Sequence, residues 1–336
     1  MTVSGKQPWA LSQLHLLLTG ECGYECDHCF VWGGQGQGNT MDRDVISLIL
    51  EQARDLGTIE WIYFEGGEPF LFFELLEWAV QLAHQSGFRV GIVSNAFWAE
   101  DLDRALENLR PLAGLVHDLS ISNDIYHGPG GTAGPADIAR NAATELGIPV
   151  DFISVSGPDS TDTAARRQSL SADDTTVCYR GRAAEKLAPL VRQQSWERFT
   201  ACPWEDLRQP SRVHVDSIGN LHICQGLSIG NLFEESLKQI MENYDPDKHP
   251  VIGPLLKGGP ADLIRQFALD HERAYADACH LCYQSRSKLR ERFPDVLTPG
   301  QMYGMANPDR SKPGSCNGNQ REKPEYETRR IRDLLA

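Results

Sequence analysis

Short apolar runs alternate with helical patterns from residue 14 to about residue 190, and this rhythm constrains the fold more than any other feature of the chain. The runs cover residues 14–19, 59–64, 89–93, 116–121, 150–155 and 175–179. Gly, Pro, Asp or Ser bounds each run, as is typical of buried parallel strands. One-sided apolar patterns predict helices over residues 45–56, 71–83, 102–112 and 139–146. Six strand-then-helix units with right-handed crossovers predict an α/β fold, a six-stranded partial (β/α)6 barrel with its functional residues at the C-terminal ends of the strands.

The rhythm ends after residue 190, where a second part of the chain begins. Residues 213–224 form two alternating runs around Gly219 and Asn220, which predicts a β-hairpin. We expect three parts: a core over residues 1–195, a small C-terminal α+β domain over residues 196–290 and a partly mobile tail over residues 291–336. Residues 307–326 of the tail are rich in Pro, Gly, Ser, Asn and charge, and the last ten residues could form a short docked helix.

Composition and charge exclude several classes of protein. Hydrophobic residues make up 41% and charged residues 23% of the 336 residues, which is ordinary for a globular chain. No apolar run approaches the roughly 18 residues of a membrane span, and the stretch at residues 14–18 lacks the cleavage site of a secretory signal. A net charge of -14 argues against a nucleic-acid partner, because phosphate binding needs a basic stripe. We therefore expect a cytoplasmic protein without a membrane or nucleic-acid partner.

Nine cysteines in such a chain point to metal or redox chemistry rather than to disulfides, because the cytosol keeps thiols reduced. Cys22, Cys26 and Cys29 directly follow the first predicted strand. Three thiolates at this spacing can bind one face of a cubane iron–sulfur cluster and leave the fourth iron without a protein ligand. A zinc site completed by His28 is the alternative, but zinc motifs generally combine cysteine pairs from two segments.

This cysteine motif resembles that of the radical S-adenosylmethionine (SAM) enzymes, which carry three cysteines at the same spacing in the loop after the first strand. The resemblance covers about residues 14–190 and implies a [4Fe–4S] cluster that binds SAM. In that family an electron enters the SAM sulfonium, and methionine and a 5′-deoxyadenosyl radical form. The radical abstracts hydrogen from an unactivated carbon. The resemblance also implies an electron donor such as flavodoxin or ferredoxin.

The resemblance further implies that residues at the strand ends bind SAM. These residues are His28, Gly66, Gly67, Glu68, Ser94, Asn95, Ser120, Ser122 and Arg182. Glycines let backbone carbonyls approach SAM closely, and Glu68 can accept a hydrogen bond from its ammonium group. Taken alone, the glycines could form a strand-to-helix turn, the Ser and Asn residues could be helix caps, and Arg182 could be a solvated arginine.

A second set of cysteines lies in the smaller domain and consists of Cys202, Cys224, Cys279 and Cys282. Four ligands suffice for zinc and for a fully ligated cubane alike, and the spacing does not separate the two. The arrangement is similar to the twitch domain, a short form of the SPASM domain that holds one auxiliary [4Fe–4S] cluster. Because no further cysteine closely follows Cys282, the resemblance implies two clusters in all.

Relatives with a twitch domain include dehydrogenases and epimerases of aminocyclitol and sugar units in antibiotic pathways. The resemblance therefore implies a small-molecule oxidoreductase of natural product biosynthesis. A dehydrogenase would need a base for the hydroxyl proton, for which Asp124, Tyr126 and His127 on the loop after the fourth predicted strand are candidates. An epimerase would need a thiol that returns hydrogen, for which Cys178 and Cys316 are candidates. Cys178 could instead be a small buried hydrophobe, and Cys316 a bystander in the tail.

Two other functions remain open. Many SPASM and twitch enzymes modify ribosomal peptides, often with a leader-binding domain of ~80 residues, for which we expect no room in this chain. A two-cluster electron carrier would need a fourth cysteine at the first site, and none is near. The acidic net charge suits a cationic aminosugar or aminocyclitol, so we expect a small-molecule substrate rather than a peptide.

Overall fold

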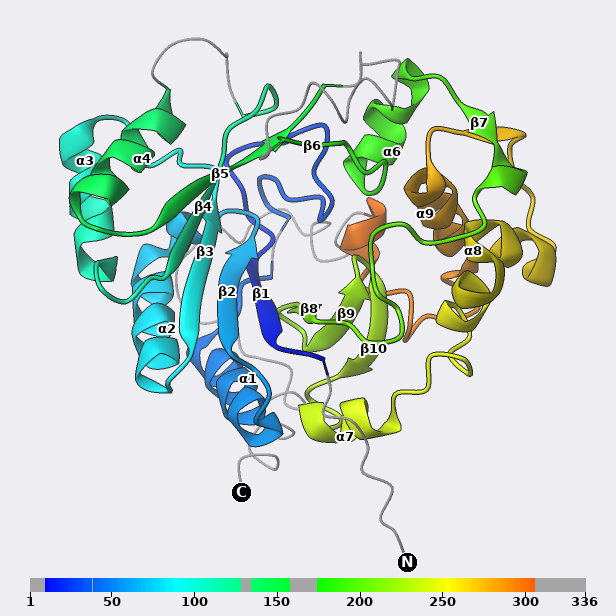
Figure 1. Ribbon diagram of the computed structural model, residues 1–336, viewed down its shortest axis with the longest axis horizontal. Helices are drawn as coiled ribbons and strands as arrows, with labels where there is room; N and C mark the ends of the chain where they lie inside the picture. Colours follow the sequence, from blue (N-terminus) through cyan, green and yellow to red (C-terminus); the bar gives the residue numbers. More distant parts are fainter. Residues whose placement is uncertain (1–9, 38, 128–133, 158–173, 306–336) are drawn as a thin grey trace, which may run out of the picture.

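A curved sheet of nine strands forms the centre of the protein (Figure 1). The computed structural model describes residues 10–37, 39–127, 134–157 and 174–305. Along the sheet the strands follow the order β10-β9-β8-β1-β2-β3-β4-β5-β6. Every neighbouring pair from β8 to β6 is parallel, whereas β8, β9 and β10 pair antiparallel. The predicted α/β class with a mostly parallel sheet is therefore confirmed.

The first six strands follow one another in chain order across the sheet. They are β1 (Gln13–Thr19), β2 (Trp61–Gly66), β3 (Arg89–Ser94), β4 (Asp118–Ser122), β5 (Val150–Val155) and β6 (Asp174–Thr175). The helices that cover the outer side of this part are α1 (Arg43–Leu56), α2 (Phe73–Gln85), α3 (Leu102–Leu109) and α4 (Pro135–Glu145) (Figure 1). The connection from β5 to β6 lies largely outside the described residues, so a complete six-unit barrel stays a prediction.

The extent of the sixth predicted strand, residues 175–179, is wrong, because β6 ends at Thr175. The physical reason is that backbone N–H groups after Thr175 donate to groups outside the sheet. The backbone N–H of Tyr179 donates to the side chain of Asp277 (3.4 Å), and the N–H of Arg180 donates to the carbonyl of Cys178 (2.7 Å). These groups are not available to a neighbouring strand, so Cys178 lies beyond the strand rather than on it.

Local sequence signals explain why α1 packs on the sheet as it does. Asp42 caps the helix by accepting from the N–H of Val45 (3.0 Å), and Gly57 ends it with a left-handed φ of 78°. The buried face of α1, which includes Ile49, shares one hydrophobic core with Leu14 and other outward-facing residues of β1. This core fixes the outer side of the sheet and leaves the inner side free for polar groups.

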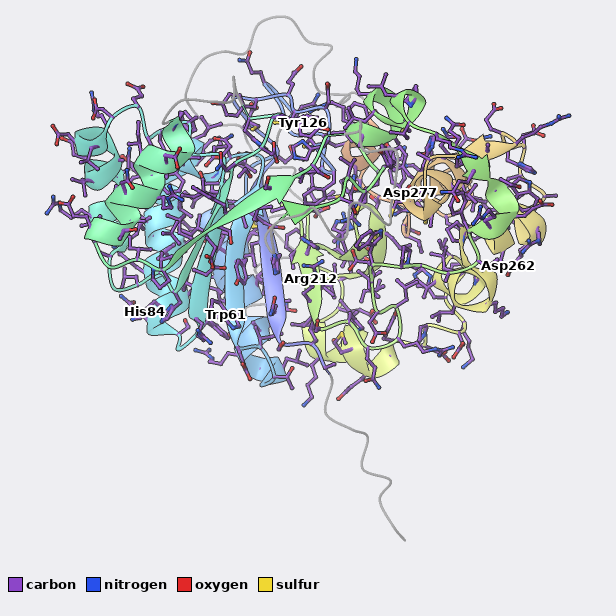
Figure 2. All side chains as sticks on the ribbon, turned by 45° about the horizontal axis from the view of Figure 1, so that its top comes forward. Trp61, His84, Tyr126, Arg212, Asp262 and Asp277 are labelled. Atoms are coloured by element: carbon purple, nitrogen blue, oxygen red, sulfur yellow. The ribbon has the colours of Figure 1, made fainter. Side chains whose placement is uncertain are left out.

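The inner face of the sheet carries polar and aromatic side chains. His15 of β1 stacks on Tyr63 of β2 with ring centroids 4.5 Å apart, and Tyr63 stacks on Trp61. The hydroxyl of Tyr63 donates to Asp118 of β4 (2.8 Å). Figure 2 shows Trp61 and Arg212 on either side of β1, on the strands that flank it. A polar interior of this kind is suited to binding a polar ligand rather than to forming a sealed core.

The second part of the chain extends the same sheet. It contains β8 (Arg212–Val215), β9 (Asn220–Cys224), β10 (Leu227–Asn231) and the helices α6 (Arg182–Lys186), α7 (Leu237–Asn243), α8 (Ile252–Phe267) and α9 (Ala278–Leu289). Two short strands, β7 (Gln194–Ser195) and β11 (Ala274–Tyr275), form a separate ladder. The predicted hairpin is confirmed as β8 and β9, and β8 also pairs in parallel with β1.

The end of the described chain is packed onto this second part. Leu297 and Met302 are buried in its hydrophobic core, together with Tyr303 of a short 3-10 helix (Gly300–Tyr303). The predicted mobile stretch over residues 307–326, the predicted terminal helix and Cys316 lie outside the described residues. In the ranges that the structure describes, no helix combines the length and the apolar character needed to cross a membrane.

Candidate active site

The loop after β1 brings Cys22, Cys26 and Cys29 to one cavity of about 120 Å³, which we call the cysteine pocket. Its wall also contains Tyr24, His28, Phe30, Val31, Gly33, Glu65, Gly66, Gly67, Val93, Ser94, Asn95, Ser122 and His127. The wall therefore combines the cysteine loop with the C-terminal ends of β2, β3 and β4. This is the edge of a parallel sheet at which ligands generally bind.

Polar N–H groups point at the sulfurs of this loop. Cys22 accepts from the N–H of Tyr24 (3.4 Å) and from the side chain of Asn95 (3.5 Å), and Cys29 accepts from the N–H of Gly33 (3.2 Å). Burial raises the pKa of Cys22 to about 11 and that of Cys26 to about 12. Because a buried thiolate needs a compensating cation, three cysteines in one pocket, with N–H donors at the sulfurs of Cys22 and Cys29, fit an iron–sulfur cluster.

Arg182 holds the cysteine loop in shape. Its guanidinium donates to the carbonyl of Cys26 (2.7 Å) and to the carbonyl of Gly33 (2.8 Å), and the side chain is buried over the ring of Trp32. It does not line the cysteine pocket. The structure therefore places Arg182 behind the loop, and contact with SAM through this residue stays a prediction.

Glycine is required at the end of β2 because two backbones touch there. The N–H of Gly67 donates to the carbonyl of Thr19 (2.6 Å), and a Cβ on Gly67 would lie 2.0 Å from the carbonyl oxygen of Glu21. Gly66 has a φ of 129°, a backbone angle that residues other than glycine rarely adopt. The glycine edge thus sets the distance between β2 and the cysteine loop, and both glycines line the cysteine pocket.

Glu68 is fully buried and fastens the end of β3 to the end of β2. Its carboxylate accepts from the N–H of Phe70 (3.1 Å), the hydroxyl of Ser94 (2.9 Å) and the N–H of Asn95 (2.8 Å). Burial raises the pKa of Glu68 to about 7. Since it is absent from the wall of the cysteine pocket, the structure shows it positioning Ser94 and Asn95, and its predicted contact with a SAM ammonium stays a prediction.

The loop after β4 places a histidine and its carboxylate partner at the pocket. Nδ1 of His127 lies 2.8 Å from Oδ1 of Asp124. The other carboxylate oxygen of Asp124, Oδ2, lies 3.7 Å from Nε2 of His28. His28 stacks on Tyr126 with ring centroids 4.5 Å apart, and burial lowers its pKa to about 4. Ser122 lines the pocket, whereas Ser120 faces the sheet interior and bonds to Asp118.

The second set of cysteines also converges. Cys202, Cys224, Cys279 and Cys282 line one small cavity, which we call the auxiliary site. Two arginines that the sequence analysis did not identify as site residues lie in its wall. Arg180 donates to the sulfur of Cys224 (3.1 Å) and to Glu205 (3.2 Å), and the buried Arg286 donates to the carbonyl of Gln225 (2.6 Å). Four sulfurs with two cations fit an anionic thiolate-ligated group, whether zinc or a cluster.

Cys178 lies beside the auxiliary site and not at the cysteine pocket. Its thiol forms a hydrogen bond with the thiol of Cys279, and the side chain is half-buried. Among the described residues it is absent from the wall of the cysteine pocket. Cys316, the other predicted hydrogen donor, lies outside the described residues.

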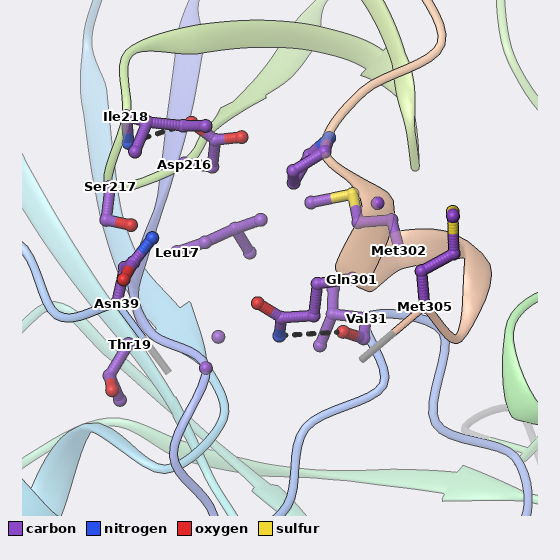
Figure 3. A pocket seen from close by; sticks show the side chains of 14 residues that line it. Leu17, Thr19, Val31, Asn39, Asp216, Ser217, Ile218, Gln301, Met302 and Met305 are labelled. Carbon is purple, nitrogen blue, oxygen red and sulfur yellow. Dashed lines mark hydrogen bonds between the residues drawn. The ribbon is translucent and has the colours of Figure 1, made fainter. Parts of the chain in front are cut away.

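A third cavity of about 150 Å³ adjoins the cysteine pocket and shares Val31 and Gly66 with it (Figure 3). It lies between the end of β1, the turn from β8 to β9 and the segment that carries Met302 and Met305. Gln301 donates to the carbonyl of Val31 (3.3 Å) and so connects that segment to the cysteine loop. Sequence periodicity gives no signal for this cavity, because its walls are far apart in the chain.

These features define an α/β protein with a three-cysteine site suited to an iron–sulfur cluster. Comparison with known families agrees with this description, since residues 16–164 match the model of the radical SAM superfamily. The chain carries a radical SAM domain, and the predicted resemblance is confirmed. Such a domain implies SAM and one [4Fe–4S] cluster as cofactors.

The curated relatives match the same part of the chain. The putative peptide biosynthesis protein YydG of Bacillus subtilis (strain 168) is 28% identical over 113 residues, which are 33% of this chain and 35% of that protein. A probable GTP 3′,8-cyclase of Saccharolobus islandicus is 34% identical over 106 residues, which are 31% of this chain and 32% of that protein. The match thus spans about a third of the length of each relative.

Among solved structures, BtrN in complex with AdoMet and 2-DOIA aligns with 16% identity and a TM-score of 0.43, over 69% of this chain and 82% of that chain.

Proposed function

We propose that this protein is a radical SAM oxidoreductase that removes hydrogen from a C–H bond of a small polar molecule such as an aminocyclitol or a sugar. The observation that carries the proposal is the wall of the cysteine pocket, where three cysteines, the glycine edge and polar strand ends face one cavity. Cys22, Cys26 and Cys29 would hold a cluster that, once reduced by an external electron donor, would supply one electron for cleavage of SAM to methionine and a hydrogen-abstracting 5′-deoxyadenosyl radical, and an auxiliary cluster would accept the electron left on the substrate.

Within this proposal, residues of the chain bind and orient the cofactor. Gly66 and Gly67 line the cysteine pocket and bring β2 close to the cysteine loop, where the methionine part of SAM would bind. Ser94 and Asn95 offer polar groups that Glu68 holds in place. The stacked rings of His28 and Tyr126 offer an aromatic surface for adenine. The six-stranded partial barrel would support all of these residues on its C-terminal edge.

A base for the substrate hydroxyl is present at the same pocket. His127 lines the cavity and Asp124 holds its Nδ1 at 2.8 Å, an arrangement that orients an imidazole to take up a proton. Loss of one hydrogen atom, one proton and one electron would convert a hydroxymethine to a ketone. The auxiliary site, with Arg180 and Arg286 beside its cysteines, supports the electron-accepting part of this reaction.

Peptide modification is a second candidate, because YydG is named a putative peptide biosynthesis protein. Under this alternative the cavity that adjoins the cysteine pocket would take a side chain of the peptide. Epimerisation by a cysteine thiol has less support from the described residues, since Cys178 lies at the auxiliary site.

The test is anaerobic turnover of the reconstituted protein with SAM, a reductant and panels of aminocyclitols, sugars and peptides, followed by mass spectrometry. We expect 5′-deoxyadenosine together with a product lighter by two hydrogens. The variant Cys202→Ala should still form 5′-deoxyadenosine but lose the oxidised product, whereas Cys26→Ala should lose both. Solvent deuterium in a product of unchanged formula, or modification of a peptide alone, would overturn the dehydrogenase proposal.

A further inference from the structure

Three potential metal ligands meet on the inner face of the sheet, outside both cysteine sites. They are His15 of β1, Glu65 of β2 and His214 of β8. The strand register brings them together: His15 lies opposite His214 on the parallel neighbour, and Leu17, two residues further along β1, lies opposite Glu65. Since residues two apart share a face of a strand, all three side chains project into the interior of the sheet.

The donor atoms have the spacing of a metal site. Nδ1 of His15 lies 3.2 Å from one carboxylate oxygen of Glu65, and Nε2 of His214 lies 3.1 Å from the other. One ligand atom from each of the three residues lies within 4.8 Å of the other two. Ligands at ordinary zinc–nitrogen and zinc–oxygen bond lengths around a tetrahedral ion are about 3.3 Å apart. The two nitrogen–oxygen separations are close to this value.

The carboxylate lies buried between the two imidazoles. Each of its oxygens has one imidazole nitrogen as its partner: Nδ1 of His15 lies 3.2 Å from Oε2, and Nε2 of His214 lies 3.1 Å from Oε1. Glu65 and His15 are each only 8% exposed. A buried carboxylate needs a positively charged partner, and a cation bound among these three side chains would supply one.

Surrounding side chains hold the two imidazoles in place. The second nitrogen of His15 lies 3.4 Å from the amide oxygen of Gln13, and its ring stacks on Tyr63. The ring of His214 has an edge contact with Phe30 of the cysteine loop. A metal-binding histidine generally gives its other N–H to such an acceptor, so Gln13 occupies the position of an outer partner of the ion.

We propose that His15, Glu65 and His214 bind one divalent transition-metal ion of the zinc or iron(II) type at the floor of the cysteine pocket. Two imidazoles and one carboxylate suit such ions and leave coordination positions open. Because Glu65 lines the cysteine pocket, an open position faces the space next to the bound cofactors. The ion would take an oxygen or nitrogen donor of the substrate there. This proposal rests on the donor set and does not depend on the proposed function.

The experiment is metal counting on the reconstituted protein with its clusters in place. The protein is dialysed against micromolar free Zn²⁺, and zinc and iron per chain are measured by mass spectrometry. We expect one zinc per chain that is lost in Glu65→Gln and in His214→Gln, with iron unchanged in both. Gln13→Ala should weaken zinc binding by about 10–100-fold. His271→Gln, at an exposed histidine outside the cluster, is the matched control and should bind zinc normally.

X-ray absorption at the zinc edge provides a readout that excludes cysteine binding and does not depend on the folding of any variant. The proposal predicts nitrogen and oxygen neighbours at about 2.0–2.2 Å and no sulfur. Sulfur neighbours at about 2.3 Å, equal zinc in wild type and both ligand variants, or no bound zinc would overturn it. In the last case the cluster would be a carboxylate flanked by two imidazoles and nothing more.

Discussion

At the scale of single residues, burial decides what the acidic and cationic groups around the cysteine pocket do. Glu68 and Arg182 were both predicted to touch SAM; in the structure Glu68 accepts from Ser94 and Arg182 donates to the carbonyl of Cys26, and their contact with SAM stays a prediction. Sequence indicates which residue types stand at a strand end, but it does not show whether a side chain turns toward the cavity or away from it. That choice depends on packing that only the folded chain contains.

Glu68 leads to a prediction for the pH dependence of stability. Because burial raises its pKa to about 7 from an ordinary value near 4.5, the folded apoprotein favours the protonated carboxyl. Glu68 therefore contributes about 3 kcal/mol to the free energy of unfolding below pH 4.5. This contribution is lost as the pH rises through 7. In Glu68→Gln this loss should be absent. Denaturant unfolding of the apoprotein between pH 4.5 and 8 measures the difference.

The matched control for Glu68→Gln is Glu51→Gln, on the exposed face of α1. It should follow the wild type at every pH, because the Glu51 side chain stays exposed to solvent when the chain folds. Parallel stability curves for the wild type and Glu68→Gln would show that folding does not shift the pKa of Glu68, and would contradict the prediction.

The cysteine sites and the inner-face cluster differ in how far sequence could predict them. Cys22, Cys26 and Cys29 lie within one loop, so their spacing alone carried the prediction, and the structure brings them to one pocket. His15, Glu65 and His214 are separated by long stretches of chain and have no common motif. Their meeting depends on strand register, which no local pattern encodes.

At the scale of elements, the periodicity predicted the strands and helices of the first part well. The predicted runs overlap β1 to β5, because each is a continuous apolar segment bounded by turn residues. The predicted extent of β6 was wrong, because the side chain of Asp277, the residue that caps α9, accepts from the backbone N–H of Tyr179. It also did not foresee the parallel pairing of β8 with β1, since strand partners far apart in the chain leave no periodic signal.

The contact between β2 and the cysteine loop leads to a prediction for two glycines. In Gly67→Ala the new Cβ would meet the backbone of Glu21 at 2.0 Å, so the loop must move away from the strand. We expect this variant to lose most of its iron at the first cluster and its affinity for SAM. Iron analysis and equilibrium binding of SAM measure both effects.

Gly23→Ala is the control for this prediction, because a Cβ at Gly23 would meet no atom within 4 Å although the residue lies in the same loop. It should keep both iron and SAM binding. Equal iron content in the two variants would show that the close backbone approach does not govern cofactor binding.

At the scale of the whole molecule, one sheet unites the two cysteine sites. β1 pairs with β2 on one side and with β8 on the other, so the sheet runs through the predicted domain boundary at residues 195 and 196. The indole N–H of Trp32, on the cysteine loop, donates to the hydroxyl of Tyr283 (3.0 Å) on α9, the helix that carries Cys279 and Cys282. The two sites are therefore held at a set distance, as transfer of an electron between them would require.

The most direct test of this account is anaerobic reconstitution, iron and sulfide counting, and electron paramagnetic resonance of the reduced protein before and after addition of SAM. The account predicts about eight irons per chain and a spectrum in which SAM changes one cluster only. Cys26→Ala should lose about four irons and the response to SAM, whereas Cys202→Ala should lose about four irons and keep the response. A response to SAM that survives Cys26→Ala, or wild-type protein that shows none, would contradict the assignment of the cysteine pocket as the SAM-binding site.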